Sequence, residues 1–475
     1  MYDTPLIFGL LVSMSKIYIS AAHKSSGKTT LSIGLCAALN KSSLQVQPFK
    51  KGPDYIDPLW LGQASKGKCY NLDFNTMSND EIVLKLNQKS QKADISIIEG
   101  NKGLYDGVNV DGSDSNAAMA KLLKTPVILV IDTRGVTRGV APLLLGYQQF
   151  DQDINIAGVI FNMVGGARHE KKLRGVVEAY TDIEILGAVH KHADLELTER
   201  HLGLMPINES ELAHEKITKI ASQVEQQVDL NKLLSIATTA PNFVDIKHPN
   251  AEIAITDTID KKPLLRIGIC KDSSFGFYYE DDLEALEAQG AELISINTLS
   301  DSKLPNNLDG LFIGGGFPET HMEKLSANKS LRQDIQDAIE AGLPTYAECG
   351  GLMYLSESLQ WQGKRVPMVG VIPADTIMYE KPQGRGYVKL EETDDMIWPN
   401  SSKGAVISGH EFHYSTLKNL REKGKFAFRV IRGTGITGVE DGWMYKNLLA
   451  SYAHMRDTNR YHWAKRFVDF IKSSP

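Results

Sequence analysis

The sequence predicts an α/β protein of two domains, the first of which carries a mostly parallel sheet. At 475 residues the chain is longer than one hydrophobic core usually supports, so two domains of about 220 residues each are expected. Apolar segments of strand length alternate with helical segments, which is typical of a parallel sheet covered by helices. Two turns lead from a predicted strand directly into a predicted helix, and they contain Gly27 and Cys349. Ligands gather beyond the carboxyl ends of parallel strands, so the residues that follow the strands are the informative ones.

The composition narrows the class of protein. Hydrophobic residues make up 42% of the chain and charged residues 23%, which are globular values. The net charge of −6 argues against binding to nucleic acid or to an anionic membrane surface, and no stretch approaches the roughly 20 apolar residues of a membrane span. The 4 cysteines are far apart and form no CxxC or Cys/His cluster, so neither a disulfide scaffold nor a zinc site is expected. A reducing cytoplasm fits this composition.

Four parts are expected along the chain. Residues 1–14 are expected to form an N-terminal extension outside the fold. Pro5–Val12 is apolar, but no basic region precedes it and no small-residue cleavage site follows it, so a signal peptide is not expected. Residues 15–235 form the first domain. Residues 236–262 form a linker, because scattered Pro, Asn, Thr and Asp leave only weak periodicity there, and residues 263–475 form the second domain.

The first domain begins with a strand, a loop and a helix that match a phosphate-binding motif. Ile17–Ser20 is the strand and Leu31–Leu39 is the helix. Between them the template G-x-x-x-x-G-K-[ST] is met at Gly27–Thr29, with Ala22 at its first position. Backbone N–H groups and the helix N-terminus can cradle phosphates, the lysine can reach the terminal phosphates, and the threonine hydroxyl can ligate Mg²⁺. The residues expected to bind ATP are Ser25, Ser26, Gly27, Lys28, Thr29 and Thr30.

Carboxylates follow the next two predicted strands. Asp54 and Asp57 come after the second strand, and Glu99 and Asp106 come after the third. Mg²⁺ takes carboxylate oxygens beside phosphate oxygens, so acids next to a phosphate loop fit magnesium-nucleotide chemistry. The alternative role is N-capping or turn formation, and for Asp57 the two roles stay equally open. The residues expected at the metal are Thr29, Asp54, Glu99 and Asp106, with Glu99 the strongest candidate.

Basic residues follow the later strands and could hold an anionic substrate. Taken singly, each of them is more often a solvated surface charge. The strands after the first are expected at Leu44–Phe49, Ala93–Ile98, Pro126–Ile131, Ile154–Phe161 and Ile183–Val189. The basic candidates for substrate contacts are Arg134, Arg168, His169, Arg200 and His201, and Tyr55 after the second strand is a further candidate.

In the second domain, Thr345–Leu352 has the pattern of a nucleophile elbow. Cys349 lies where a strand runs into a helix, with the small residues Ala347 and Gly351 on either side. The N-terminus of the new helix points at the sulfur and favours the thiolate, which is the nucleophilic form. The alternative is a buried structural cysteine, since free cysteine is among the most buried residue types. The surrounding sequence favours the nucleophile.

A thiolate nucleophile needs a general base and an oxyanion hole, and the chain offers both. A predicted strand ends in the glycines 314–316, so Gly315 or Gly316 can donate N–H groups to an oxyanion together with Gly350. A second apolar strand, Asn447–Ala453, delivers His454 at its end. His410 and His413 are rival bases, but we favour His454 because it alone follows a clean apolar strand.

The cysteine, the glycine loop and the histidine together resemble a class I glutamine amidotransferase, which hydrolyses glutamine through a thioester and releases ammonia. From about Ile17 to about Phe470 the chain resembles the cobyrinic acid a,c-diamide synthases. Besides the phosphate loop, the strings that carry the resemblance are Lys51–Pro58, Asn71–Asp73, Glu99–Gly100, Leu104–Gly107, Glu199–Leu204, Phe277–Tyr279, Gly314–Glu319, Glu348–Tyr354 and Gly409–Ser415.

The resemblance implies a dethiobiotin-synthetase-like P-loop domain, which binds ATP and the tetrapyrrole, followed by a flavodoxin-like class I glutamine amidotransferase domain. It implies a ligase of cobalamin biosynthesis that uses ATP, Mg²⁺ and glutamine to amidate the a and c acetate side chains of a corrinoid through an acyl phosphate. It is compatible with a homodimer. Two alternatives stay open: the same diamidation on sirohaem or nickel-sirohydrochlorin, and a regulatory P-loop ATPase with a relic glutaminase domain.

The chain departs from the family patterns at informative positions. Ala22 replaces the first glycine of the phosphate loop. Many class I amidotransferases carry Glu two residues after the histidine, whereas His454 is followed by Met455 and Arg456. A dyad of Cys349 and His454 is therefore expected, as the resemblance also implies. The sibling cobyric acid synthase usually has Gln-Asn-Met where this chain has Gly52–Tyr55, so it is a poorer match.

Overall fold

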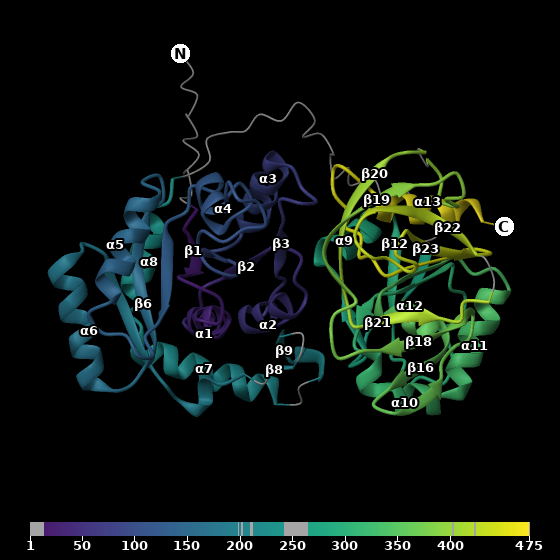
Figure 1. Cartoon of the computed structure of the whole chain (residues 1–475), viewed down its shortest axis with the longest axis horizontal. Coiled ribbons are helices and arrows are strands. Elements are labelled where there is room, and N and C mark those ends of the chain that lie inside the picture. The colour runs from purple at the N-terminus through teal and green to yellow at the C-terminus, as the bar shows by residue number, and fades with distance from the viewer. Residues whose placement is uncertain are drawn as a thin grey trace, which may run out of the picture. The chain divides into compact units, whose positions relative to one another are not determined.

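The computed structural model describes residues 14–197, 199–200, 203–209, 212–241, 265–400, 403–421 and 424–474, which form two compact units (Figure 1). The first unit contains the described residues up to Leu72, then Asn79–Met205, and then the chain from 212 to 241. The second contains Asp73–Ser78, residues 206–209 and all described residues from Leu265 onward. Within the described residues no helix is long and apolar enough to cross a membrane.

The first unit is built on a seven-stranded sheet in the order β3-β2-β4-β1-β5-β6-β7, and every pairing in it is parallel. This confirms the predicted parallel α/β architecture. Six of the strands were expected, whereas β3 is too short for a periodic pattern to reveal it. The strands are β1 Lys16–Ala21, β2 Val46–Lys51, β3 Tyr70–Leu72, β4 Ile95–Glu99, β5 Val127–Asp132, β6 Ile156–Val164 and β7 Glu184–His190.

Helices connect these strands, as right-handed crossovers between parallel strands require. The α7 helix lies alongside α1 (Figure 1), and a Cβ added at Gly34 of α1 would come within 2.4 Å of the Val224 side chain of α7. Glycine thus permits the close approach of the two helices. A small hairpin joins β8 Glu199–Arg200 to β9 Gly203–Leu204. The helices are α1 Lys28–Lys41, α2 Ile56–Ser65, α3 Asn79–Ser90, α4 Asn116–Leu122, α5 Val140–Phe150, α6 Ala167–Tyr180, α7 Ala213–Gln227 and α8 Leu230–Thr238, with the 3₁₀ turn η1 Ala193–Leu195.

The predicted linker and extension are only partly described. Residues 236–238 belong to α8, where Ala237 is fully buried, so the helical packing of the first unit continues past the expected boundary at 235. Residues 1–13 of the predicted extension and 242–262 of the predicted linker lie outside the described residues.

The second unit is built on a nine-stranded mixed sheet in the order β12-β10-β13-β15-β24-β23-β22-β19-β20. The pairings from β12 to β24 are parallel and those from β24 to β20 are antiparallel. A four-stranded sheet, β17-β16-β18-β21, and a short pair, β11 with β14, complete it. The strands are β10 Leu265–Cys270, β11 Phe275–Phe277, β12 Ala291–Ile296, β13 Gly310–Ile313, β14 Gly315–Gly316, β15 Thr345–Glu348, β16 Ser356–Trp361, β17 Lys364–Pro367, β18 Ile372–Met378, β19 Gly384–Glu392, β20 Val406–His413, β21 Ser415–Lys418, β22 Lys425–Arg432, β23 Glu440–Tyr445 and β24 Leu448–Ser451.

Two hydrophobic clusters cover the two faces of the larger sheet. Successive side chains of a strand point to opposite faces, and β15 follows this rule, because Tyr346 packs in one cluster and Ala347 in the other. Trp398 and Trp463 pack around the Tyr346 ring at centroid distances of 5.1 Å. The helices of this unit are α9 Glu280–Ala288, α10 Met322–Ala327, α11 Lys329–Glu340, α12 Gly350–Leu355 and α13 Trp463–Ser473, with the 3₁₀ turns η2 Ile207–Glu209 and η3 Pro318–His321. The core therefore holds β15 rigidly up to the residue before Cys349.

Candidate active sites

The phosphate loop of the first unit runs from the end of β1 to the start of α1. Gly27 has φ +85°, and a Cβ there would come within 2.1 Å of the side-chain nitrogen of Asn162, so glycine is required. No side chain caps α1, so the first N–H groups of the helix can bind a ligand anion. Ala22, in contrast, has no positive φ. The backbone at the first motif position is therefore one that alanine adopts without strain.

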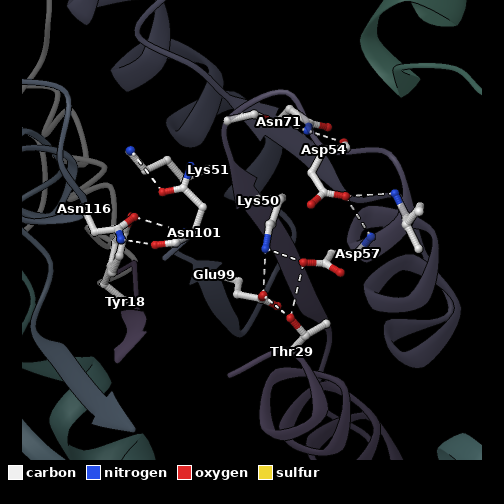
Figure 2. A network of polar contacts seen from close by, with 12 residues as sticks. Tyr18, Thr29, Lys50, Lys51, Asp54, Asp57, Asn71, Glu99, Asn101 and Asn116 are labelled. Carbon is white, nitrogen blue, oxygen red and sulfur yellow. Dashed lines mark hydrogen bonds and ion pairs between the residues drawn. The ribbon is translucent and has the colours of Figure 1, made fainter. Parts of the chain in front are cut away.

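Lys50, at the end of β2, occupies the centre of a buried polar cluster beside this loop (Figure 2). Its Nζ donates to Oε1 of Glu99 at 2.7 Å and to Oδ2 of Asp57 at 2.5 Å. The Thr29 hydroxyl donates to the same two oxygens, at 2.7 Å and 3.2 Å respectively. The parallel register places Lys50 directly beside Glu99. The side chains of Lys50 and Glu99 are 3% and 0% exposed.

Burial makes the charges in this cluster interdependent. Burial disfavours the charge of Lys50, but Asp57, Glu99 and Asp54 outweigh this and hold the lysine pKa well above its usual value. Burial raises the pKa of Glu99, and Lys50 opposes that shift. The pKa of Lys28 is lowered to about 8, because burial and the charge of Lys50 disfavour its proton. A bound phosphate would favour the charged form of Lys28.

The cluster fits a magnesium ion that is shared with nucleotide phosphates. Oε2 of Glu99 is buried and has no hydrogen-bond partner among the described residues. Thr29 and Asp57 supply a hydroxyl and a second carboxylate beside it, which are the oxygen ligands that Mg²⁺ prefers. The described part of the chain contains no cluster of three His, Cys, Asp or Glu side chains that could hold a metal by themselves. The remaining ligands would then come from phosphate and water.

The structure places Asp54 and Asp106 differently from the sequence expectation. Oδ1 of Asp54 accepts from the N–H groups of Ile56 and Asp57 at the start of α2. Burial and the neighbouring Asp57 raise the pKa of Asp54 to about 7. Oδ2 of Asp106 accepts from the N–H of Gly103 at 3.0 Å. Asp57, whose role the sequence left open, is the aspartate that contacts Thr29, and Asp54 has the capping contacts.

The structure places the residues expected to contact substrate in different parts of the first unit. Arg134 is 63% exposed and paired with Asp132. Nδ1 of His169 accepts from the N–H of Gly165, and its Nε2 lies 2.7 Å from the carbonyl oxygen of Val136. Tyr55 is buried and precedes α2, and Arg168 is exposed on α6. Only the backbone of Arg200 is described, and His201 lies outside the described residues. Their contacts with substrate stay a prediction.

In the second unit the turn from β15 into α12 has the geometry of a nucleophile elbow. Cys349 has φ 47° and ψ −99°, a conformation that is strained for any residue with a Cβ. Its N–H donates to Ser451 of β24 at 2.7 Å, and its carbonyl accepts from the N–H of Met353 in α12 at 3.0 Å. A Cβ at Gly351 would come within 2.2 Å of the Ile313 carbonyl oxygen, so the turn also requires glycine there. Cys349 is 6% exposed.

His454 is the histidine that contacts Cys349. Burial opposes its positive charge, but the neighbouring Cys349 and Glu348 outweigh this and raise the pKa of His454 to about 10. Its ring stacks on His410 at 4.8 Å, and burial together with the charges of His454 and Arg456 holds the pKa of His410 well below its usual value. His413 instead stacks on Tyr452 and lies 2.8 Å from the carbonyl oxygen of Ser415. His410 therefore serves as a neutral packing partner of the base.

The glycine loop lies against the cysteine and the histidine. A Cβ at Gly315 would come within 2.6 Å of the His454 ring, and one at Gly350 within 2.9 Å of the Gly316 nitrogen. The N–H of Gly314 donates to the Tyr278 hydroxyl at 2.9 Å. Gly315, Gly316 and Gly350 thus remain the candidates for binding an oxyanion.

Lys50 is a member of the first candidate site that sequence reasoning missed. It stands in a strand that also contains Val46 and Phe49, both buried, so it reads as an ordinary strand-end lysine. The available signal was a lysine at the end of a buried strand, next to a phosphate loop in the predicted sheet. Its pairing with Glu99 and Asp57 depends on the strand order β2-β4-β1, which the sequence does not specify.

Comparison with known proteins identifies both halves of the chain. The CobQ/CobB/MinD/ParA nucleotide binding domain matches residues 18–205, and the CobB/CobQ-like glutamine amidotransferase domain matches residues 266–461. A cobyrinate a,c-diamide synthase of Magnetococcus marinus is 44% identical over 96% of this chain and 97% of its own. One of Caldanaerobacter subterraneus subsp. tengcongensis is 39% identical over 96% of this chain and 98% of its own. The solved structure of PurLQS from Thermotoga maritima aligns with 44% of this chain and 97% of its own at 17% identity, with a TM-score of 0.35.

Replacing Lys50 with Met tests whether the lysine and a magnesium ion share one set of carboxylates. Without the ammonium, Asp57 and Glu99 form a buried pair of like charges, so the free energy of unfolding should fall by about 3–5 kcal/mol in the presence of a chelator. Mg²⁺ should recover more of this loss in Lys50→Met than it adds to the wild type, as measured by thermal unfolding.

Lys41→Met is the matched control. Lys41 pairs with Glu225 on the surface, and loss of such a pair should change stability by about 0–1 kcal/mol whether or not Mg²⁺ is present. An equal effect of Mg²⁺ on Lys50→Met and on the wild type would contradict the shared site.

Proposed function

Because the chain belongs to the cobyrinate a,c-diamide synthase family, we propose that it amidates the a and c acetate side chains of a corrinoid, with ATP as energy source and glutamine as nitrogen donor. The observation that carries the proposal is the alignment of the chain with such enzymes over almost its whole length, together with one candidate site in each unit. One is the phosphate loop with Thr29, Asp57 and Glu99, and the other is Cys349 with His454.

At the first site the chain activates a carboxylate. A free carboxylate resists attack by ammonia, so the terminal phosphoryl group of ATP passes to a carboxylate oxygen of the substrate and leaves ADP and an acyl phosphate. Lys28 and the N–H groups at the start of α1 hold the phosphates during this transfer. Thr29, Asp57 and Glu99 are the residues that would hold Mg²⁺, which when bound neutralises phosphate charge.

At the second site the chain releases ammonia from glutamine. The Cys349 thiolate attacks the side-chain amide carbon, and N–H groups of Gly315, Gly316 and Gly350 bind the oxyanion that forms. His454 then gives its proton to the departing nitrogen, which leaves as ammonia, and a thioester remains. Water hydrolyses the thioester to glutamate, with His454 taking the proton of the water. The ammonia displaces phosphate from the acyl phosphate and forms the amide.

Replacing Cys349 with Ala should abolish glutamine-dependent amidation, a loss of about 10³-fold or more, because no nucleophile remains. Amidation with a high concentration of ammonium salt should continue, since the first site is intact. Both rates are measured by chromatography of the amidated product. Cys270→Ala is the control, because Cys270 is also buried in the same unit and packs in its core. Undiminished glutamine-dependent synthesis in Cys349→Ala would refute the glutaminase assignment.

Replacing Glu99 with Gln should remove synthesis with either nitrogen source, by roughly 10²-fold or more, because the proposed metal loses a charged ligand. The glutaminase reaction of the second site, followed by glutamate release, should still be measurable. Glu178→Gln, an exposed change on α6, should alter neither reaction. Normal ammonium-dependent synthesis in Glu99→Gln would exclude Glu99 from the nucleotide site.

The substrate is tested by mass spectrometry of the products formed from cobyrinate, sirohaem and nickel-sirohydrochlorin, each with ATP and glutamine. We expect a diamide from cobyrinate alone. A diamide formed only from sirohaem or nickel-sirohydrochlorin would overturn the corrinoid assignment while keeping the reaction. ATP turnover without any tetrapyrrole and without amidation would instead support a regulatory ATPase.

A further inference from the structure

The position that usually supplies an acid to the catalytic histidine holds a cation in this chain. Arg456 stands two residues after His454 and pairs with Asp281, its Nη2 lying 2.8 Å from an Asp281 carboxylate oxygen. Its guanidinium also lies 4.8 Å from the centre of the Tyr279 ring. An arginine fixed in this way cannot accept a hydrogen bond from His454. If His454 has an acidic partner, it must come from another element.

Glu348, the residue immediately before Cys349, lies next to the histidine. Its Oε2 is 3.4 Å from Nδ1 of His454, and the two side chains are 4% and 3% exposed. Its other oxygen, Oε1, accepts from the Tyr346 hydroxyl and from the N–H of Met455 at 2.9 Å. One oxygen is thus anchored on both sides of the site, which directs the second oxygen at the histidine.

The anchoring follows from the strand. Residues two apart on a strand share a face, so the side chains of Tyr346 and Glu348 in β15 point the same way. The Tyr346 ring is fully buried between Trp398 and Trp463, so its hydroxyl is held in place. A carboxylate positioned by a packed core loses little entropy when it holds its partner.

We infer that Glu348 is the third member of the catalytic group, a positioning residue that holds the proton of His454 on Nδ1 and stabilises the imidazolium. This inference rests on the proposed glutaminase function of the second unit. With Nδ1 directed at Glu348, Nε2 is left for the Cys349 sulfur. The proton of the Cys349 thiol passes to Nε2, which gives a thiolate and an imidazolium, and the same proton later leaves with the ammonia. The proton therefore moves between the sulfur, Nε2 and the leaving nitrogen, and Glu348 takes no part in its transfer.

The other groups around His454 do not supply this role. Among the described residues, the titratable groups next to the ring include Cys349 and Glu348 from the elbow and His410 from β20, with Tyr279 and Arg456 beyond His410. His410 is kept neutral by burial and by the charges near it, which hold its pKa well below the usual value. Cys349 and Glu348 are the neighbours that favour protonated His454, and Glu348 is the one of the two that forms no bond to glutamine.

Glutaminase kinetics of Glu348→Gln test the inference. The glutamine side chain can keep the contacts of Oε1 but removes the charge beside Nδ1. We expect kcat to fall by roughly 10²- to 10⁴-fold with little change in the KM for glutamine, as when the acid of a catalytic triad is neutralised. Loss of the His454 proton ends activity at high pH. In the wild type the alkaline limb, which is the fall of kcat on the high-pH side of its pH profile, should therefore lie near pH 10. It should move to lower pH in Glu348→Gln, because the imidazolium has lost its stabilising anion.

Glu411→Gln is the matched control. Glu411 is also a buried carboxylate beside a histidine, with 3.6 Å between its Oε2 and Nε2 of His413, and it accepts from the N–H groups of Thr434 and Gly435. Because His413 does not serve Cys349, this variant should keep the kcat and the alkaline limb of the wild type. Glu348→Asp keeps the charge on a shorter stem, so it should keep the alkaline limb close to that of the wild type while lowering kcat.

Wild-type kcat and an unmoved alkaline limb in Glu348→Gln would overturn the inference. Ammonium-dependent synthesis by each variant reports the integrity of the first site, and circular dichroism reports folding of the whole chain. If Glu348→Gln does not fold, Glu348→Asp decides, and full kcat in the folded variant would overturn the positioning role. Glutaminase activity that survives in Cys349→Ala would mean that the proposed function has failed, which is a separate result.

Discussion

The first site depends on a buried ion pair between Lys50 and Glu99, at the ends of two neighbouring strands. Glu99 is fully buried at the end of β4, and such a carboxylate is costly unless a cation lies next to it. Lys50 supplies that cation because β2 and β4 are neighbours in register. The same oxygens contact Thr29 at the start of α1, so the phosphate loop and the acids form one connected group. Binding of the proposed nucleotide and metal at this point would replace the charge of Lys50 as the partner of these carboxylates.

The second site combines backbone strain at Cys349 with a buried pair of Glu348 and His454. The positive φ of Cys349 is maintained because β15 is buried on both faces and its neighbours β13 and β24 hold it on both edges. The same rigid strand ends in Glu348 and leads directly into Cys349. His454 arrives from the end of the adjacent strand β24, so three side chains converge without any flexible segment between them. Both units thus place their chemistry at the carboxyl ends of parallel strands.

Much of this arrangement could be predicted, and the errors have physical causes. The alternation of apolar and helical segments revealed six of the seven strands in the first sheet, but β3 spans three residues and is too short to show periodicity. Asp54 and Asp57 stand in one short string, and a linear pattern cannot tell which of them caps α2 and which faces Thr29. The acid of the glutaminase site was sought after His454, where related patterns have it. Glu348 was overlooked because the carboxylate precedes the nucleophile instead.

The sequence by itself determined the two domains, the parallel sheet of the first and the two strand-to-helix turns, because these follow from local periodicity and short motifs. It also named Cys349 and His454 as candidate catalytic residues. Only the tertiary structure decided which charges meet. Strand order placed Lys50 against Glu99, and the packing around Tyr346 directed Glu348 at His454. Such pairings join residues 49 and 106 positions apart, and no local pattern records them, because they exist only once the sheets have formed.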